Sequence, residues 1–166
     1  MNRLLIDLDI CSKCDECGSL CSYREHPHNN GIMSIRELAH FSVICRRCSD
    51  APCVAACPMS ALEKQADGKL KRYLMRCTSC KSCSRACPFG TIYSDTIPFI
   101  ASRCDACIGR LNNGSNPICL DSCQAGGISF GNFDENREAN MFKISENIIV
   151  KTSLKWEREL PQSQKR

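Results

Sequence analysis

The chain has 166 residues, of which 16 are cysteine and only 6% are aromatic, and its formal net charge is +4. Because aromatic residues are scarce, covalent or metal cross-links must replace part of a purely hydrophobic core. Asp7 and Asp9 interrupt the apolar start, and no apolar run approaches the roughly eighteen residues that cross a bilayer, which argues against a secreted disulfide scaffold and a membrane-spanning protein.

Short elements are predicted between the cysteine loops of the first third of the chain. Residues 3–10 alternate apolar and polar side chains, which predicts a strand. Residues 22–31 are polar and are expected to form a surface loop. Residues 32–44 have no clean period, so this stretch is compatible with either a helix or a strand.

The middle of the chain contains an internal repeat of a cysteine loop, a short helix and a strand. The residues after Cys53 predict one helical turn that breaks near a proline. Residues 61–65 and 70–75 flank Asp67-Gly68 and predict a hairpin. The second copy of the repeat predicts a strand at residues 91–94.

The last third is predicted to contain a surface excursion, a strand and a tail. Residues 107–119 are rich in Asn and Gly and are expected at the surface. Residues 128–130 follow two glycines and predict a short strand. The polar, basic stretch 151–166 is expected to be a solvated extension, with a docking arm as the alternative.

The sixteen cysteines fall into four groups of four, each with three residues before its last cysteine. The groups are Cys11, Cys14, Cys17 and Cys21; Cys45, Cys48, Cys53 and Cys57; Cys77, Cys80, Cys83 and Cys87; and Cys104, Cys107, Cys119 and Cys123.

This spacing is typical of iron-sulfur proteins. The first and third groups have the pattern C-x2-C-x2-C-x3-C, in which three thiolates hold one 4Fe-4S cube and the fourth holds a neighbouring cube. Pro58 and Pro88 follow the second and third groups, which therefore resemble the two halves of a bacterial two-cluster ferredoxin. Ser22 and Gln124 replace this proline in the first and fourth groups, which would form a second pair.

Zinc is the alternative interpretation of sixteen thiolates, and only the fourth group, with its longer gap, resembles a zinc site. Each oxidised cluster with its thiolates carries about −2, so four clusters would change the formal charge of +4 to about −4. Seven basic residues beside the cysteines are predicted to offset this charge: Arg46, Arg47, Arg76, Lys81, Arg85, Arg103 and Arg110. The histidines, His26, His28 and His40, are expected at the surface and not as metal ligands.

The order of the groups, the two Cys-Pro endings and the segment from Arg103 to Cys107, with Arg110, Gly114, Pro117 and Cys119, resemble one family. It is that of the four-cluster ferredoxin subunits of the dimethyl sulfoxide reductase electron-transfer type, which accompany molybdenum or tungsten oxidoreductases, formate dehydrogenases and nickel-iron hydrogenases. The resemblance covers about residues 9–131.

The resemblance implies four ligand sets, each with three cysteines of one group and the last cysteine of another. Cluster 1 is held by Cys11, Cys14, Cys17 and Cys123; cluster 2 by Cys104, Cys107, Cys119 and Cys21; cluster 3 by Cys45, Cys48, Cys53 and Cys87; and cluster 4 by Cys77, Cys80, Cys83 and Cys57. It also implies an α+β fold of two ferredoxin-like modules, one nested inside the other. The outer module is residues 1–44 plus 97–135, the inner module is residues 45–96, and residues 136–166 form a C-terminal extension.

The expected function is non-catalytic electron transfer in anaerobic metabolism, because no phosphate-binding loop, dinucleotide motif or nucleophile-base pair is present. The resemblance implies a large catalytic partner (a molybdenum or tungsten enzyme or a hydrogenase), a further flavin or ferredoxin partner, and an outer module that faces the catalytic subunit. We expect a cytoplasmic protein that neither binds nucleic acid nor inserts into a membrane. The alternatives are a freely diffusing polyferredoxin and a cysteine-rich zinc module that binds nucleic acid.

Overall fold

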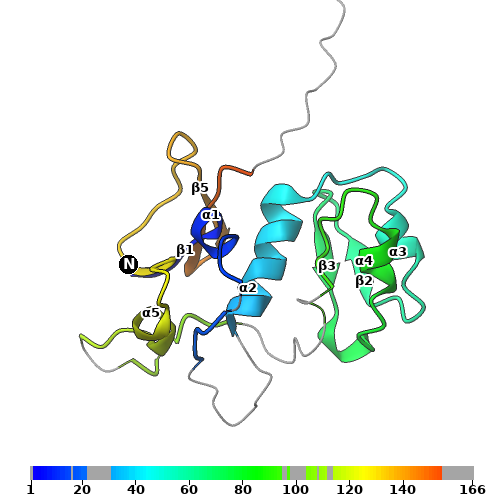
Figure 1. Ribbon diagram of the computed structural model, residues 1–166. Helices are drawn as coiled ribbons and strands as arrows, with labels where there is room; N and C mark the ends of the chain where they lie inside the picture. Colours follow the sequence, from blue (N-terminus) through cyan, green and yellow to red (C-terminus); the bar gives the residue numbers. More distant parts are fainter. Residues whose placement is uncertain are drawn as a thin grey trace, which may run out of the picture.

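The computed structural model describes residues 2–15, 17–21, 31–94, 97, 104–107, 109–111 and 114–154. Short helices and two small sheets make up this part of the chain, which confirms the α+β class. Figure 1 shows two lobes on either side of helix α2 (Gly31–Ala39). We call them the sheet lobe, which holds the four-stranded sheet with α1 and α5, and the hairpin lobe, which holds α3, α4, β2 and β3.

The sheet of the sheet lobe has the strand order β4-β1-β6-β5. β1 (Arg3–Asp7) pairs antiparallel with β4 (Ile128–Gly131) and parallel with β6 (Ile148–Lys151), and β5 (Met141–Ser145) pairs antiparallel with β6. The strand predicted at residues 128–130 is thereby confirmed. β5 and β6 lie in the predicted C-terminal extension, 136–166, where the side-chain pattern predicts no strand.

β1 is shorter than the predicted strand because a helical turn replaces its last residues. The Asp7 side chain accepts hydrogen bonds from the backbone N–H groups of Asp9 and Ile10, at 3.0 and 3.3 Å, and so caps α1 (Leu8–Cys11). N-cap hydrogen bonds of this kind satisfy backbone donors that a helix start leaves without partners. The cap, and not the alternation of side chains, decides the local structure here.

The ambiguous stretch 32–44 is helical and packs against both lobes. α2 continues directly into a π-helical turn, η1 (His40–Ile44). Ile32, Ile35 and Ala39 are buried with Leu4 and Ile6 of β1, whereas Phe41 is buried with the apolar residues of the hairpin lobe. One continuous helical segment therefore connects the two hydrophobic clusters.

The hairpin lobe contains α3 (Pro52–Ala55), β2 (Leu62–Lys64), β3 (Leu70–Arg72), the 3-10 turn η2 (Leu74–Arg76) and α4 (Ser82–Ala86). The predicted helical turn after Cys53 and the predicted hairpin are confirmed. The strand predicted at residues 91–94 is wrong, because these residues are irregular and pair with neither β2 nor β3. Ile92 is instead buried in the core of the lobe.

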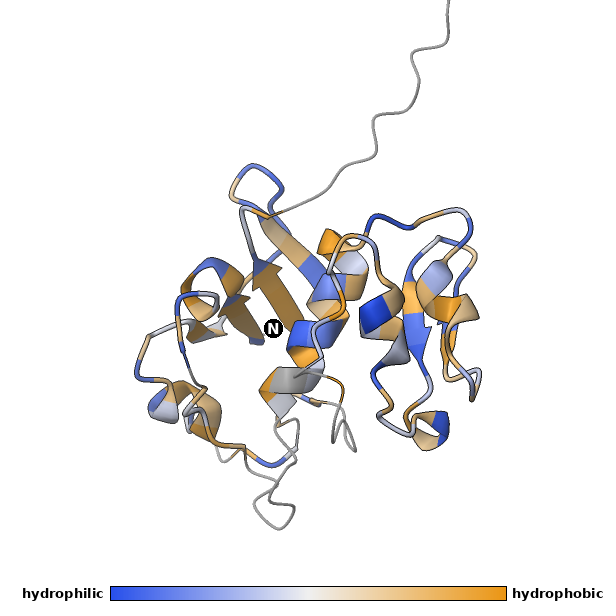
Figure 2. Cartoon of the chain, turned by 45° about the vertical axis from the view of Figure 1, so that its right-hand side comes forward, coloured by the Kyte–Doolittle hydropathy of each residue, from blue (hydrophilic) through white to orange (hydrophobic). Residues whose placement is uncertain are grey.

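α5 (Ile118–Ser122) precedes β4 and completes the sheet lobe. Figure 2 shows that hydrophobic residues are concentrated in the strands of the larger sheet. No helix in the described ranges is long and apolar enough to cross a membrane. Residues 22–30 of the loop predicted at 22–31 lie outside the described residues, and Gly31 begins α2 instead. Residues 155–166 of the tail predicted at 151–166 also lie outside them, and Lys151 is the last residue of β6.

Candidate functional site

All sixteen cysteines lie in the described part of the chain, and all are free thiols. The third cysteine of three groups occupies a one-turn helix: Cys53 in α3, Cys83 in α4 and Cys119 in α5. Each of these three thiols is buried, with 5 to 8% of the residue exposed. In these three groups the short helix therefore directs one sulfur inward and begins the turn toward the fourth cysteine, whereas Cys17 of the first group is exposed.

Left-handed backbone helps to fold the cysteine loops tightly. Ala51 precedes α3 with φ of 40°, and Lys81 precedes α4 with φ of 62°. Ala106 and Cys107 have φ of 53° and 57° in the fourth group. Non-glycine residues rarely adopt this conformation, so these four positions mark sites where the fold constrains the backbone.

One cavity in the hairpin lobe is lined by the sulfur-bearing residues Cys45, Cys48, Cys53 and Cys87. Its empty volume is about 370 Å³, and Leu70, Pro88 and Ile92 contribute apolar walls. Three of these cysteines belong to the second group and one to the third. The structure thus brings together residues that are up to 42 positions apart.

A second cavity, in the sheet lobe, is lined by Cys104, Cys107 and Cys119 of the fourth group and by Cys21 of the first. Its empty volume is also about 370 Å³. Gly31 lies at this cavity, where an added Cβ would come within 3.4 Å of both Cys21 Sγ and Cys104 Cβ. The absence of a side chain at Gly31 lets the two groups approach each other.

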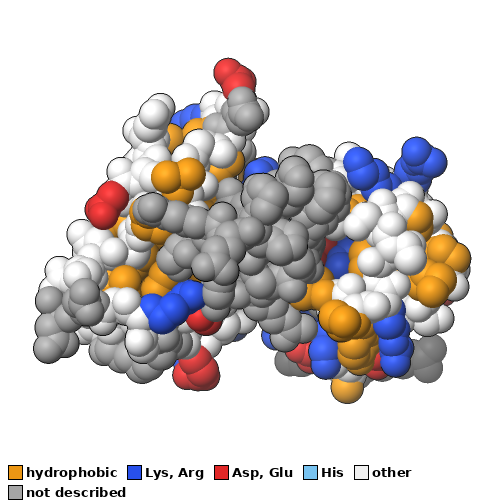
Figure 3. All heavy atoms as spheres, turned by 90° about the horizontal axis from the view of Figure 1, so that it is seen from below, with side chains coloured by type: hydrophobic (Ala, Val, Ile, Leu, Met, Phe, Trp, Pro, Cys, Tyr) orange, Lys and Arg blue, Asp and Glu red, His pale blue; other side chains and the backbone are white. Residues whose placement is uncertain are grey.

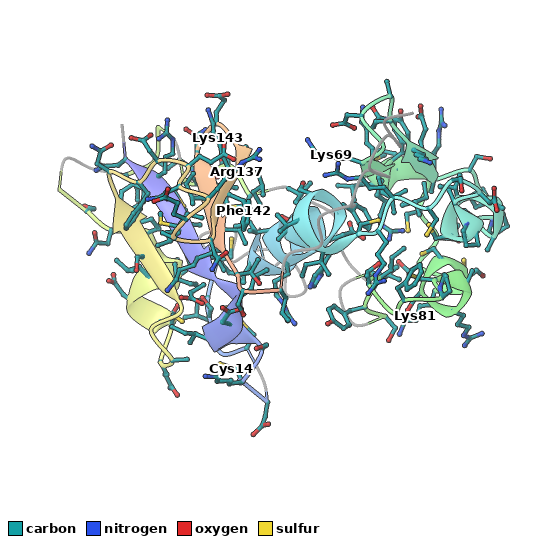
Figure 4. All side chains as sticks on the ribbon, turned by 90° about the horizontal axis from the view of Figure 1, so that it is seen from above. Cys14, Lys69, Lys81, Arg137, Phe142 and Lys143 are labelled. Carbon is teal, nitrogen blue, oxygen red and sulfur yellow. The ribbon has the colours of Figure 1, made fainter. Side chains whose placement is uncertain are left out.

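A third, wider cavity is lined by Cys11, Cys14, Cys17 and Cys123. Arg36 of α2 and Lys13 also line it. Cys14 and Cys17 are exposed, and Figure 4 shows Cys14 at the outer end of the sheet lobe. The same figure places Lys81, the neighbour of the exposed Cys80, on the other lobe beside α4.

The four remaining cysteines, Cys57, Cys77, Cys80 and Cys83, lie in the hairpin lobe, where Cys57, Cys77 and Cys83 contribute to one hydrophobic cluster. The buried Arg72 guanidinium joins two of them, because it donates to Cys77 Sγ at 3.5 Å and to Cys83 Sγ at 3.7 Å. Cys57 Sγ accepts a hydrogen bond from the Ala61 N–H at 3.2 Å.

The thiols of the cavities interact electrostatically in the same sets. Burial raises the pKa of the Cys11 thiol to about 11, and repulsion from the Cys123 thiolate is the next largest cause of the rise. Burial likewise raises the pKa of Cys119 to about 12, and Cys104, Cys107 and Cys21 add to the rise. Gathering four thiolates in an apolar cavity is thus unfavourable without a bound cation, and binding of a metal cluster would release their protons.

The donor set fits a 4Fe-4S cluster. Four cysteine sulfurs are its usual ligands, and hydrogen bonds from backbone N–H groups to those sulfurs are part of its usual surroundings. Ala106 N–H donates to Cys104 Sγ at 3.4 Å, in addition to the bond from Ala61 to Cys57. Among the described residues, no three Cys, His, Asp or Glu side chains converge closely enough to hold a single metal ion.

The basic residues named from the sequence have mixed surroundings. Arg46 and Arg47 line the cavity of Cys45, with the Arg46 guanidinium 4.6 Å from the centre of the Phe89 ring. Arg110 lines the cavity of Cys104 and pairs with Asp105 at 2.7 Å. Arg103, like His26 and His28, lies outside the described residues.

His40 and Arg72 lie in places that their sequence context does not predict. His40 was expected at the surface, but it is buried in η1 with its ring 4.6 Å from that of Tyr93. Arg72 was not named at all, although it contacts cysteine sulfurs. The alternation of side chains in β3 indicates that Arg72 faces inward, since it shares the buried face of the strand with Leu70.

Comparisons with known proteins agree with this donor set. Residues 36–133 match the family model described as a 4Fe-4S dicluster domain. The protein is 29% identical to the B subunit of the anaerobic dimethyl sulfoxide reductase of Escherichia coli (strain K12) over 152 residues, which cover 80% of this sequence and 74% of that protein. It is 34% identical over 103 residues to the thiosulfate reductase electron transfer subunit PhsB of Salmonella typhi, covering 60% of this sequence and 54% of that protein. The resemblance predicted from the cysteine motifs is confirmed.

Proposed function

The protein belongs to the 4Fe-4S dicluster domain family, and on that premise we propose that it is an electron-transfer subunit that carries four 4Fe-4S clusters. The observation that carries the proposal is the grouping of thiols around three cavities. Each cavity combines three cysteines of one group with the last cysteine of another group. This is the reciprocal ligation that two-cluster ferredoxins use.

We assign the ligands of the clusters accordingly. Cluster 1 takes Cys11, Cys14, Cys17 and Cys123; cluster 2 takes Cys104, Cys107, Cys119 and Cys21; cluster 3 takes Cys45, Cys48, Cys53 and Cys87; and cluster 4 takes Cys77, Cys80, Cys83 and Cys57. The first three sets are supported by the shared cavities. The fourth set follows from the same rule and is supported by the Arg72 contacts to Cys77 and Cys83.

The assignment gives two nested modules. Clusters 1 and 2 belong to the outer module, residues 1–44 plus 97–135, and clusters 3 and 4 to the inner module, residues 45–96. The division is supported by two separate hydrophobic clusters. One contains residues of β1, α5 and β4, and the other contains residues of β2 and β3 together with Phe41 and Ile97, which lie at the ends of the outer module's two segments. In this arrangement α2 belongs to the outer module and lies between its sheet and the hairpin lobe.

When bound, each cluster supplies a site that accepts and releases one electron. The chain holds the clusters in apolar cavities, directs backbone N–H groups at the sulfurs and places positive charge nearby. These are the means by which a protein sets cluster potentials. The described residues thus supply the environment that electron relay requires.

The exposed cysteines suggest where electrons enter and leave. Cys14 and Cys17 are exposed on the sheet lobe, and Cys80 is exposed on the hairpin lobe. We propose that the outer module faces the catalytic subunit and that the inner module faces the other redox partner, a flavin protein or ferredoxin. The inner module, residues 45–96, has nine Lys or Arg against four Asp or Glu, and two clusters of about −2 each would bring this formal charge of +5 to about +1. Figure 3 shows Lys and Arg side chains on this lobe among hydrophobic ones.

The catalytic partner is proposed to be a molybdenum or tungsten oxidoreductase or a hydrogenase. The relatives support a partner of this kind, since their names describe subunits of reductases. Sixteen free thiols are suited to a reducing compartment, so we place the complex in the cytoplasm.

Metal and sulfide analysis of the anaerobically purified full-length chain tests the proposal. We expect about sixteen iron atoms and about sixteen acid-labile sulfides per chain, a brown protein and no affinity for DNA. About four zinc atoms without sulfide would reject the proposal in favour of the zinc module. Gel filtration of the untagged native protein tests the partner separately, because a freely diffusing polyferredoxin would elute without a large catalytic chain.

A further inference from the structure

A buried ion pair lies directly against two cysteine sulfurs of the hairpin lobe. The side chain of Arg72 in β3 is 3% exposed, and that of Glu37 in α2 is 8% exposed. Arg72 Nε donates to Glu37 Oε1 at 2.7 Å, and Arg72 Nη2 lies 2.6 Å from the same oxygen. The two terminal nitrogens of the guanidinium also donate to Cys77 Sγ and Cys83 Sγ, at 3.5 to 3.8 Å.

Folding alone gives little reason for this pair. Removing two charges from water costs about as much free energy as their mutual attraction returns. A pair of apolar side chains of similar size therefore often stabilises a core equally well. The position is otherwise apolar, because Leu70 lies on the same face of β3 and the Phe41 ring centre is 5.9 Å from the guanidinium carbon. A charge at this place therefore indicates a role beyond packing.

The role follows from the chemistry of the neighbouring thiolates. On the ligand assignment proposed above, Cys77 and Cys83 hold cluster 4, and one-electron reduction changes the charge of the cluster with its thiolates from about −2 to about −3. The electron comes from a reductant, and no bond to Arg72 forms or breaks. A fixed positive charge that donates to two ligand sulfurs stabilises the reduced form, whereas the carboxylate of Glu37 opposes it.

We propose that Arg72 raises the reduction potential of cluster 4 through its hydrogen bonds to the sulfurs of Cys77 and Cys83. Glu37 holds the guanidinium in this position, and its negative charge limits the rise in potential. The inference rests on the proposed function. It goes further because it assigns to one non-ligand pair a specific effect on one of the four clusters.

The pair also connects the two lobes. Glu37 lies on the helix whose Ile35 and Ala39 pack into the core of the sheet lobe, and Arg72 lies on the hairpin of the other lobe. The orientation of α2 on the sheet therefore determines where the guanidinium lies. The potential of cluster 4 is thereby linked to the packing of the outer module.

Redox titration of the full-length chain with dithionite, followed by electron paramagnetic resonance, tests the proposal. In Arg72→Met we expect one cluster to be harder to reduce by at least tenfold in its one-electron equilibrium, which is about 59 mV. In Glu37→Gln we expect one cluster to shift in the opposite direction. Lys71→Met is the matched control, because it removes the same charge from the exposed neighbouring position and should leave all potentials unchanged.

The outcomes separate this inference from the proposed function. Fewer than four clusters in the unmodified chain would reject the proposed function. Four clusters with unaltered potentials in Arg72→Met, or equal shifts in Arg72→Met and Lys71→Met, would reject the inference alone. If Arg72→Met fails to fold with Glu37 left unpaired, Glu37→Gln decides, since it keeps the guanidinium in place. A downward shift or no shift in that variant would overturn the proposal.

Discussion

Substitution of Cys123 by alanine tests whether residues far apart in the sequence share one cluster. Cys123 lines the same cavity as Cys11, Cys14 and Cys17, although more than a hundred residues separate it from them. Cys21 belongs to the same sequence motif as Cys14 but lines a different cavity, with Cys104, Cys107 and Cys119. The structure therefore predicts that Cys14 and Cys123 act together, and that Cys14 and Cys21 act independently.

The expected magnitude is a count of intact clusters. Cys14→Ala and Cys123→Ala should each leave about three intact 4Fe-4S clusters of about four, because each removes one ligand of the same cluster. The double variant Cys14→Ala/Cys123→Ala should also leave about three, whereas Cys14→Ala/Cys21→Ala should leave about two. The first pair is non-additive because both substitutions affect one site.

Mössbauer spectroscopy of iron-57-reconstituted protein counts intact clusters, and iron and sulfide analysis checks the total. The count also registers a three-iron remnant as a lost 4Fe-4S cluster. If Cys14→Ala/Cys21→Ala kept about three intact clusters and Cys14→Ala/Cys123→Ala kept about two, ligation would follow the sequence motif, and the assignment made from the cavities would be refuted.

Further predictions concern the surroundings of the clusters and the fold. Gly127→Ala should lower the occupancy of the cluster at Cys11, measured by iron content, because the new Cβ would lie 3.2 Å from Cys11 Sγ, whereas Gly131→Ala, whose Cβ would meet only the Phe133 ring at 3.5 Å, should leave it unchanged. Removal of iron by a chelator should abolish the native circular dichroism spectrum, since ligand closure supplies ordering energy that the small apolar core lacks. Ile6→Ala should lower the free energy of unfolding by about 2 to 5 kcal/mol in denaturant titrations, because Ile6 is fully buried under the helix. Asp7→Ala should lower it by about 1 kcal/mol in the same assay, through loss of the α1 cap and of the ion pair with Lys151; an unchanged midpoint would contradict the capping argument.

Local signals predicted several elements correctly because those elements depend on neighbouring residues. The turn at Asp67-Gly68 specifies the hairpin of β2 and β3 within a few positions. The same kind of reasoning failed at residues 91–94, which are irregular and pair with neither strand of the two-stranded sheet. It also missed β6, whose parallel pairing with β1 joins residues more than 140 positions apart.

The sequence by itself determined the kind of donor and the expectation of iron-sulfur chemistry, because C-x2-C-x2-C-x3-C places three sulfurs within reach of one cluster. The family followed from a resemblance in the order of the groups, the Cys-Pro endings and the segment from Arg103 to Cys119. Only the tertiary structure decided which distant thiol lines each of the three cavities and where Arg72 lies. Both depend on how α2 packs between the sheet and the hairpin, and such long-range contacts leave no local periodicity in a sequence.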